Sequence, residues 1–120
     1  MGLKITSRGV DEVVVLALEG RIVFGAETIA LSEKVKSLLA SGKKKLVLDL
    51  NNVTFIDSAG LDVLIIGHIS AKSSGASLRL CNLGSRSNEL LQITKLCTVF
   101  EVSETEADAV CALAKRASAV

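Results

Sequence analysis

The stretch of this chain best suited to chemistry is a serine between an apolar segment and a run of large aliphatic residues. Val53–Ile56 reads as a strand, Asp57-Ser58-Ala59-Gly60 as a turn, and Leu61–Ile66 as the start of a helix. A helix N-terminus carries unpaired N–H donors and about half a positive charge, and both favour a phosphate group. The pattern therefore predicts Ser58 as a site of modification.

The neighbours of Ser58 have predicted roles of their own. Asp57 is expected to cap the helix by accepting an N–H from its first turn, and also to orient the Ser58 hydroxyl. Gly60 has no side chain, so we expect it to allow close approach of a partner's backbone or of a neighbouring loop.

Catalysis by these residues is not expected. A serine at a strand-to-helix turn can be a hydrolase nucleophile, but the Gly-x-Ser-x-Gly pattern is absent. The only histidine, His68, follows ten positions later on the same helix, which places it roughly 15 Å away. It is therefore out of reach as a general base. No phosphate-binding Gly-rich loop is present either, so we expect no enzyme activity and no cofactor.

The cysteines do not indicate a metal site or a disulfide framework. Cys81, Cys97 and Cys111 are odd in number and form no Cys-x-x-Cys pair. A zinc site would also need more than one histidine. We expect the three cysteines to be buried as small apolar side chains.

The overall composition narrows the classes of function. The 120 residues suit a single domain, residues 1–120, and 49% of them are hydrophobic. A net charge of +1 and an aromatic content of 2% argue against nucleic-acid binding. The apolar runs Val13–Leu18 and Val63–Ile66 are too short to cross a membrane, and no signal peptide is evident. We therefore expect a cytoplasmic protein with no membrane partner.

The first half of the chain predicts a hairpin followed by a helix. Leu3–Ser7 and Val13–Leu18 are expected to pair through a turn at residues 8–11, with Gly20 closing the second strand. A helix should run from about Gly25 to Ser41. Its buried face follows helical spacing and contains Thr28, Leu31, Val35, Leu38 and Leu39.

The second half alternates strands and helices. We expect a strand at Leu46–Leu50, interrupted by Asn51-Asn52 before Val53–Ile56, then a helix to about Ser74 and a strand at Ser77–Cys81. A helix capped by Ser85 or Ser87 and an edge strand at Val99–Val102 are expected next. The last helix should open with a Ser103–Glu106 capping box, and its inner face should contain Val110, Leu113, Ala114 and Ala117.

Together these elements predict an α/β domain. Its mixed sheet of four to five strands should combine an N-terminal antiparallel hairpin with parallel crossovers, and about four helices should cover it.

The helix after Ser58 has two apolar stripes. If Leu61, Leu64, Ile65 and His68 face the sheet, then Ile66 and Ile69 lie near solvent beside Asp62. An exposed apolar strip next to a modifiable serine suits a docking surface. The alternative is a helix buried on both sides.

The motif Asp57-Ser58-Ala59-Gly60-Leu61, preceded by Val47–Leu50 and Val53–Ile56, is similar to the signature of the STAS domain, the anti-sigma-factor antagonist family. The resemblance runs along nearly the whole chain. It implies a partner switch: the unmodified protein binds an anti-sigma factor that is also a serine kinase, and this releases the sigma factor. Phosphorylation of Ser58 ends the binding, and a serine phosphatase reverses it. Ala59 stands where relatives often carry a second serine.

The sequence departs from this family in the loop after the second strand. Relatives that are phosphorylated commonly have Gly-x-Leu-Asp there, whereas Gly20-Arg21-Ile22-Val23 places Val23 at the carboxylate position. Phe24, Gly25 and Glu27 of this loop are expected to contribute to docking. Phe24 suits an interface anchor, and the alternative is that it fills the core.

A second function within the same family is a non-catalytic scaffold or accessory subunit of a signalling assembly or membrane transporter. The missing loop carboxylate gives this alternative weight. A monomer or homodimer in solution would favour the switch, and a megadalton particle would favour the scaffold.

Overall fold

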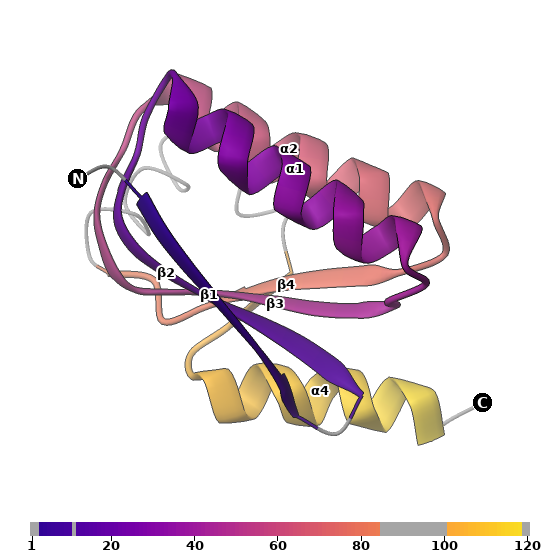
Figure 1. Ribbon diagram of the computed structural model, residues 1–120. Helices are drawn as coiled ribbons and strands as arrows, with labels where there is room; N and C mark the ends of the chain where they lie inside the picture. The colour runs from indigo at the N-terminus through magenta and orange to yellow at the C-terminus, as the bar shows by residue number, and fades with distance from the viewer. Residues whose placement is uncertain (1–2, 11, 85–100, 119–120) are drawn as a thin grey trace.

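The domain is built on a five-stranded mixed sheet with helices on both faces (Figure 1). The computed structural model describes residues 3–10, 12–84 and 101–118 of the chain. The spatial order is β1-β2-β3-β4-β5, with β1 and β2 antiparallel and the other neighbouring pairs parallel. The strands are β1 (Leu3–Val10), β2 (Val13–Ile22), β3 (Lys45–Ile56), β4 (Ser77–Cys81) and β5 (Glu101–Ser103).

Three helices lie within the described residues: α1 (Ala26–Ala40), α2 (Ser58–Ser73) and α4 (Glu106–Ser118). α1 and α2 lie side by side on one face of the sheet, and α4 covers the other face (Figure 1). The α/β class, the hairpin and the parallel crossovers are confirmed. The helix expected after Ser85 or Ser87 and the first half of the Val99–Val102 strand lie outside the described residues. None of the described helices has the length and apolar character that a bilayer crossing requires.

Burial on both faces explains why the central strands are apolar almost throughout. The larger core cluster lies between the sheet and the α1–α2 layer and includes Leu16, Leu48, Leu64 and Leu80. The smaller cluster lies under α4 and contains Val13, Val15, Val47, Cys81, Ala109 and Leu113. Each fully buried aliphatic side chain stabilises the fold by about 1.5–3 kcal/mol, so among the described residues the α1–α2 side contributes most of the apolar stabilisation.

The predicted inner face of α1 is confirmed. Thr28, Leu31 and Val35 are buried, and Leu38 and Leu39 are partly buried. The hydroxyl of the buried Thr28 has a hydrogen-bond partner, because it donates to the Gly25 carbonyl at 2.9 Å.

The strand boundaries differ from the sequence-based expectations. β1 continues to Val10, β2 continues past Gly20 to Ile22, and Asn51-Asn52 does not interrupt β3. The register explains the last difference: Ala17 pairs with Asp49 but Glu19 pairs with Asn52. β3 therefore carries one extra residue as a β-bulge, which keeps both asparagines inside the strand.

A second bulge follows where β2 and β3 end. Gly20 pairs with Val53, and Arg21 pairs with Phe55. Thr54 is the extra residue, and its hydroxyl donates to the Gly20 carbonyl at 3.2 Å. Gly20 has a φ of 110°, a conformation that glycine tolerates best.

The predicted capping box of the last helix is wrong. α4 begins at Glu106, and Thr105 caps it by accepting the Asp108 N–H at 3.1 Å. Ser103 ends β5 instead and accepts a hydrogen bond from Arg79 Nε at 3.1 Å, while Glu106 forms an ion pair with Arg8 of β1. Tertiary partners thus replace the local pair. Leu113 is buried and Val110 partly buried as expected, and the side chains of Ala114 and Ala117 lie outside the described residues.

Two glycines of α2 differ sharply in the space around them. A Cβ on Gly60 would clash with the Ile22 carbonyl oxygen and lie 2.9 Å from Ile56 Cγ2. A Cβ on Gly67 would meet Leu78 Cδ1 at 3.7 Å and Val35 Cγ1 at 3.8 Å, which is ordinary contact. Gly60 therefore sets how closely α2 approaches the end of β2. Of the two expected roles for Gly60, contact with a neighbouring segment is the one observed.

Gly60→Ala should lower the free energy of unfolding by about 1–3 kcal/mol, because backbone must move to admit the methyl group. Gly67→Ala is the matched control and should be neutral or stabilising by up to about 1 kcal/mol, since alanine favours helix and the space exists. Urea unfolding followed by circular dichroism measures both. Equal effects of the two substitutions would contradict the close approach at Gly60.

Candidate functional site

The candidate site lies where α2 begins, and Asp57 holds it together. Its carboxylate accepts the Gly60 N–H through Oδ1 at 2.8 Å and the Phe24 N–H through Oδ2 at 3.0 Å. The Asp57 N–H in turn donates to the Ile22 carbonyl at 3.2 Å. The predicted N-cap is confirmed. The same side chain also ties the loop after β2 to the start of α2.

These hydrogen bonds favour the ionised form of Asp57. The Phe24 N–H, followed by the Gly60 N–H, lowers the pKa of this carboxyl below its ordinary value of 3.8. Asp57 is therefore a carboxylate at neutral pH, and its negative charge faces the positive end of the α2 dipole.

Ser58 is the first residue of α2, and its side chain is exposed. One of the N–H donors in the first turn of α2 already has a side-chain partner. The Gly60 N–H is bound to the Asp57 carboxylate, and the Leu61 N–H is bound to the Asp57 carbonyl at 3.0 Å. The Gly60 N–H is therefore engaged already, whereas the Leu61 bond is the first regular hydrogen bond of the helix. The Ser58 side chain is open to solvent and takes no part in capping α2.

The outer face of α2 is apolar and open to solvent. Leu61, Leu64 and His68 are buried, whereas Ile66 is 49% exposed and Ile69 is 55% exposed. The predicted orientation of the helix is confirmed, with Ile65 partly buried, and as far as the described residues show, α2 is not buried on both sides.

The loop after β2 adds the most exposed large apolar side chain of the described residues. Phe24 is 82% exposed and does not fill the core. Because its N–H is bound to Asp57, Phe24 lies next to the start of α2. We call the surface formed by Phe24, Ser58, Asp62, Ile66 and Ile69 the docking surface. Gly25, Glu27 and Ala59 are half-buried along it, whereas Gly60 is buried beneath it.

Sequence reasoning missed three exposed residues, Arg21, Ile29 and Phe55. Ile29 of α1 is 60% exposed, and a helical wheel would have placed it opposite the buried face. Phe55 is 44% exposed, and the guanidinium of Arg21 lies 5.5 Å from the centre of its ring. The bulge at Thr54 produces the pairing of Arg21 with Phe55, and no sequence signal for this bulge was evident.

The described residues do not bring together a catalytic or metal-binding set. His68 is buried among the inner residues of α2. Cys81 is buried as expected, and desolvation raises the pKa of its thiol to about 12. Cys111 is exposed, which corrects its expected burial, and Cys97 lies outside the described residues. Residues 3–10, 12–84 and 101–118 contain no group of three His, Cys, Asp or Glu side chains that could hold a metal ion.

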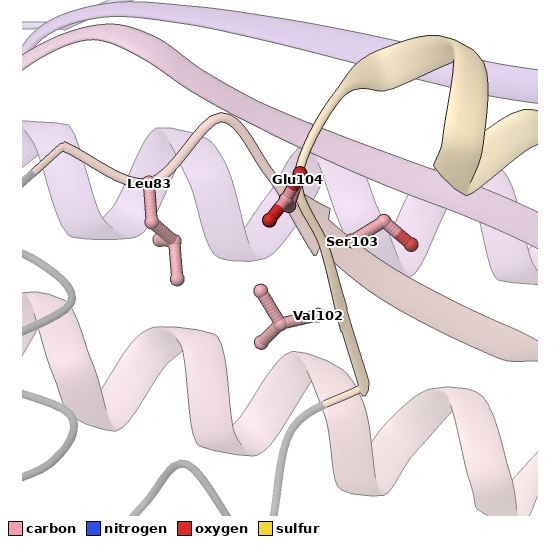
Figure 2. Close-up of a pocket in the computed structure, with 4 residues that line it drawn as sticks. All are labelled: Leu83, Val102, Ser103 and Glu104. Carbon is pink, nitrogen blue, oxygen red and sulfur yellow. The ribbon is translucent and has the colours of Figure 1, made fainter.

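A pocket next to β5 likewise offers little chemistry. It is lined by Leu83, Val102, Ser103 and Glu104 (Figure 2). The Ser103 hydroxyl points away from it and accepts a hydrogen bond from Arg79. A single carboxylate beside two aliphatic side chains does not form a nucleophile–base pair.

The lowered pKa of Asp57 predicts a pH-dependent contribution to stability. Its stabilising effect should be present in full above the unfolded-state pKa and be lost as pH falls through the lower folded-state value. Asp57→Asn should therefore unfold at a lower temperature than the wild type at pH 7, and the difference should shrink below pH 3.8. Thermal unfolding at pH values from 7 to 2.5 measures this. A difference that does not depend on pH would contradict the assignment.

With this geometry in place, comparison with known proteins gives a consistent result. The STAS domain family model matches residues 4–109. BtrV of Bordetella bronchiseptica, which is named as an anti-sigma factor antagonist, is 26% identical over 103 residues, covering 86% of this chain and 88% of BtrV.

Solved structures show the same fold. A structure from Thermotoga maritima named for an anti-sigma factor antagonist aligns with a TM-score of 0.84 and 24% identity, over 91% of this chain and 93% of that one. Bacillus SpoIIAA in its phosphorylated form aligns with a TM-score of 0.70 and 17% identity, over 89% and 96% of the two chains. The family model spans most of the described sheet and helices, and it includes the Asp57–Leu61 turn. This chain belongs to the STAS domain family.

Proposed function

We propose that this protein is an anti-sigma factor antagonist that works by partner switching. In its unphosphorylated state it binds an anti-sigma factor that is also a serine kinase. Phosphorylation of Ser58 releases it, and a serine phosphatase restores binding. The observation that carries the proposal is an exposed serine at the start of α2, beside the exposed apolar side chains of Phe24, Ile66 and Ile69.

The charge of a phosphate explains how binding would end. Phosphorylation adds about −1.5 to −2 charge units at neutral pH. Asp57 and the exposed Asp62 already make this surface negative, and Asp57 occupies N–H donors that could otherwise compensate the phosphate. A partner docked on the apolar strip would have to bury or face that charge. Such a mismatch costs several kcal/mol, and each 1.4 kcal/mol lowers affinity tenfold.

The fold would survive the modification because Ser58 has no part in capping α2. Asp57 supplies the cap and the link to the loop after β2. A charged group on Ser58 would also lie near the positive end of the helix dipole, which tolerates it. The switch would therefore change the surface and leave the core unaltered.

The relatives agree with this function. BtrV carries the name of an anti-sigma factor antagonist, and the Bacillus protein of the same fold exists in a phosphorylated form. The substitution of Val23 for a loop carboxylate does not break the link to the motif, because that link is made by the backbone N–H of Phe24.

Val23 also gives specific support to an alternative. Without a carboxylate at position 23 of the loop, the same surface could serve stable assembly as a non-catalytic scaffold or accessory subunit. Size-exclusion chromatography with light scattering separates the two functions: a monomer or homodimer supports the switch, and a megadalton particle supports the scaffold.

Incubation with the cognate kinase and ATP should add one phosphate, on Ser58, and the product should lose at least tenfold in affinity for that kinase. Intact-mass and peptide mass spectrometry locate the phosphate, and calorimetry measures the binding. The circular dichroism spectrum should not change, because Asp57 still caps α2.

Ser58→Ala should accept no phosphate and retain binding, whereas Ser37→Ala, at an exposed serine of α1, should behave as the wild type. A phosphate mapped to another residue would overturn the site. Unchanged affinity after modification of Ser58 would overturn the switch.

Ile66→Lys should weaken binding to the same kinase at least tenfold while shifting the free energy of unfolding by less than about 0.5 kcal/mol, because Ile66 is half exposed. Ser73→Lys adds the same charge at the far end of α2 and serves as the control. Thermal melts and calorimetry provide the readouts. A collapse in stability would place Ile66 in the core, and equal binding of both variants would remove it from the docking surface.

A further inference from the structure

Arg21 and Phe55 form an exposed pair at the ends of β2 and β3. The guanidinium of Arg21 lies 5.5 Å from the centre of the Phe55 ring, within the range of a cation–π interaction. The ring is 44% exposed, and Arg21 is exposed as well. The flat ring therefore supports the guanidinium at the surface, with N–H donors available to solvent.

The backbone is shaped to produce this pair. Without the bulge at Thr54, Arg21 would lie opposite Thr54 rather than Phe55. The bulge is fixed by the hydrogen bond from the Thr54 hydroxyl to the Gly20 carbonyl and by the positive φ of Gly20. Bulges are common next to functional sites, where they redirect a side chain. The arrangement limits the freedom of Arg21 before any partner arrives.

The pair lies close in the chain to the docking surface but on the other face of the sheet, because Ile22 and Ile56, the next residues of β2 and β3, belong to the core cluster under α1 and α2. Ile22, the residue after Arg21, accepts the Asp57 N–H through its carbonyl. Phe55 lies three positions before Ser58 in the same chain segment, and Phe24 is bound to Asp57. A protein docked over Ser58 and Phe24 would need to extend only across the end of the sheet to contact Arg21.

The charge of Arg21 is not neutralised within the chain as described. The ion pairs found among residues 3–10, 12–84 and 101–118 are Arg8–Glu106 and Lys45–Glu12. Arg21 therefore offers a planar guanidinium, which binds carboxylates through two parallel hydrogen bonds. Arginine and aromatic side chains are also the residues that dominate binding energy in protein interfaces.

We propose that Arg21, supported by Phe55, binds a carboxylate of the anti-sigma factor and so extends the partner contact across the end of the sheet. This inference rests on the proposed function, because the occupant is the same partner. The positive charge of Arg21 complements that carboxylate, while the negative charges of Asp57 and Asp62 keep the Ser58 side sensitive to phosphorylation. Arg21 thus strengthens the binding of the partner, and Ser58 controls its release.

The test measures affinity for the purified kinase-type anti-sigma factor at several salt concentrations. Arg21→Ala should weaken binding about tenfold or more and flatten the dependence of affinity on salt, since a charged contact is lost. Arg21→Lys should be intermediate, because it keeps the charge but not the planar donors. Lys36→Ala, at an exposed lysine of α1, is the control and should match the wild type.

The outcomes separate the two proposals. If the wild type binds and Ser58→Asp does not, while Arg21→Ala equals the wild type in affinity and salt dependence, the inference is wrong and the switch stands. If the wild type does not bind the kinase, the proposed function fails and this inference fails with it. Unchanged thermal melts of Arg21→Ala exclude misfolding as the cause of a loss.

Discussion

The site depends on one carboxylate that bonds to the backbone of two separate segments. Asp57 accepts the Gly60 N–H at the start of α2 and the Phe24 N–H in the loop after β2. The absence of a side chain at Gly60 lets the helix approach Ile22 closely enough for this geometry. Because both bonds favour the ionised carboxyl, the junction is strongest at neutral pH. The relative positions of Phe24, Ser58 and the exposed face of α2 follow from it.

Because Asp57 makes these hydrogen bonds, the cap of α2 and the exposed hydroxyl belong to two different residues. In many helices the capping residue is a serine, and modifying it would remove the cap. Here Asp57 caps α2 and Ser58 occupies the next position, exposed and with no structural duty. A chemical change at Ser58 can therefore alter what the surface presents while the core clusters on both faces of the sheet keep their packing. Such independence suits a protein whose proposed task is to bind and release a partner.

The ends of β2 and β3 add a second level of organisation. β3 carries two more residues than β2 over their paired length, one at each bulge. The first bulge keeps Asn51 and Asn52 within the strand, and the second places Arg21 over Phe55. Bulged strands twist and bend locally. The two bulges therefore change the course of β2 and β3 shortly before the turn that carries Ser58.

The sequence alone determined the α/β class, the order of the described elements and the cap at Asp57, because these follow from local periodicity and from hydrogen bonds between near neighbours. It could not decide whether Phe24 was buried or which neighbour approached Gly60, since both depend on how the β2 loop packs against α2. Local reasoning also failed at Ser103 and Glu106, where Arg79 and Arg8 from distant strands replaced the expected capping box. The bulge at Thr54 was likewise invisible, because a bulge is defined by the register of two strands. Contacts between distant segments were therefore decided only by the tertiary structure, where the packing of the whole chain selects among local alternatives of similar energy.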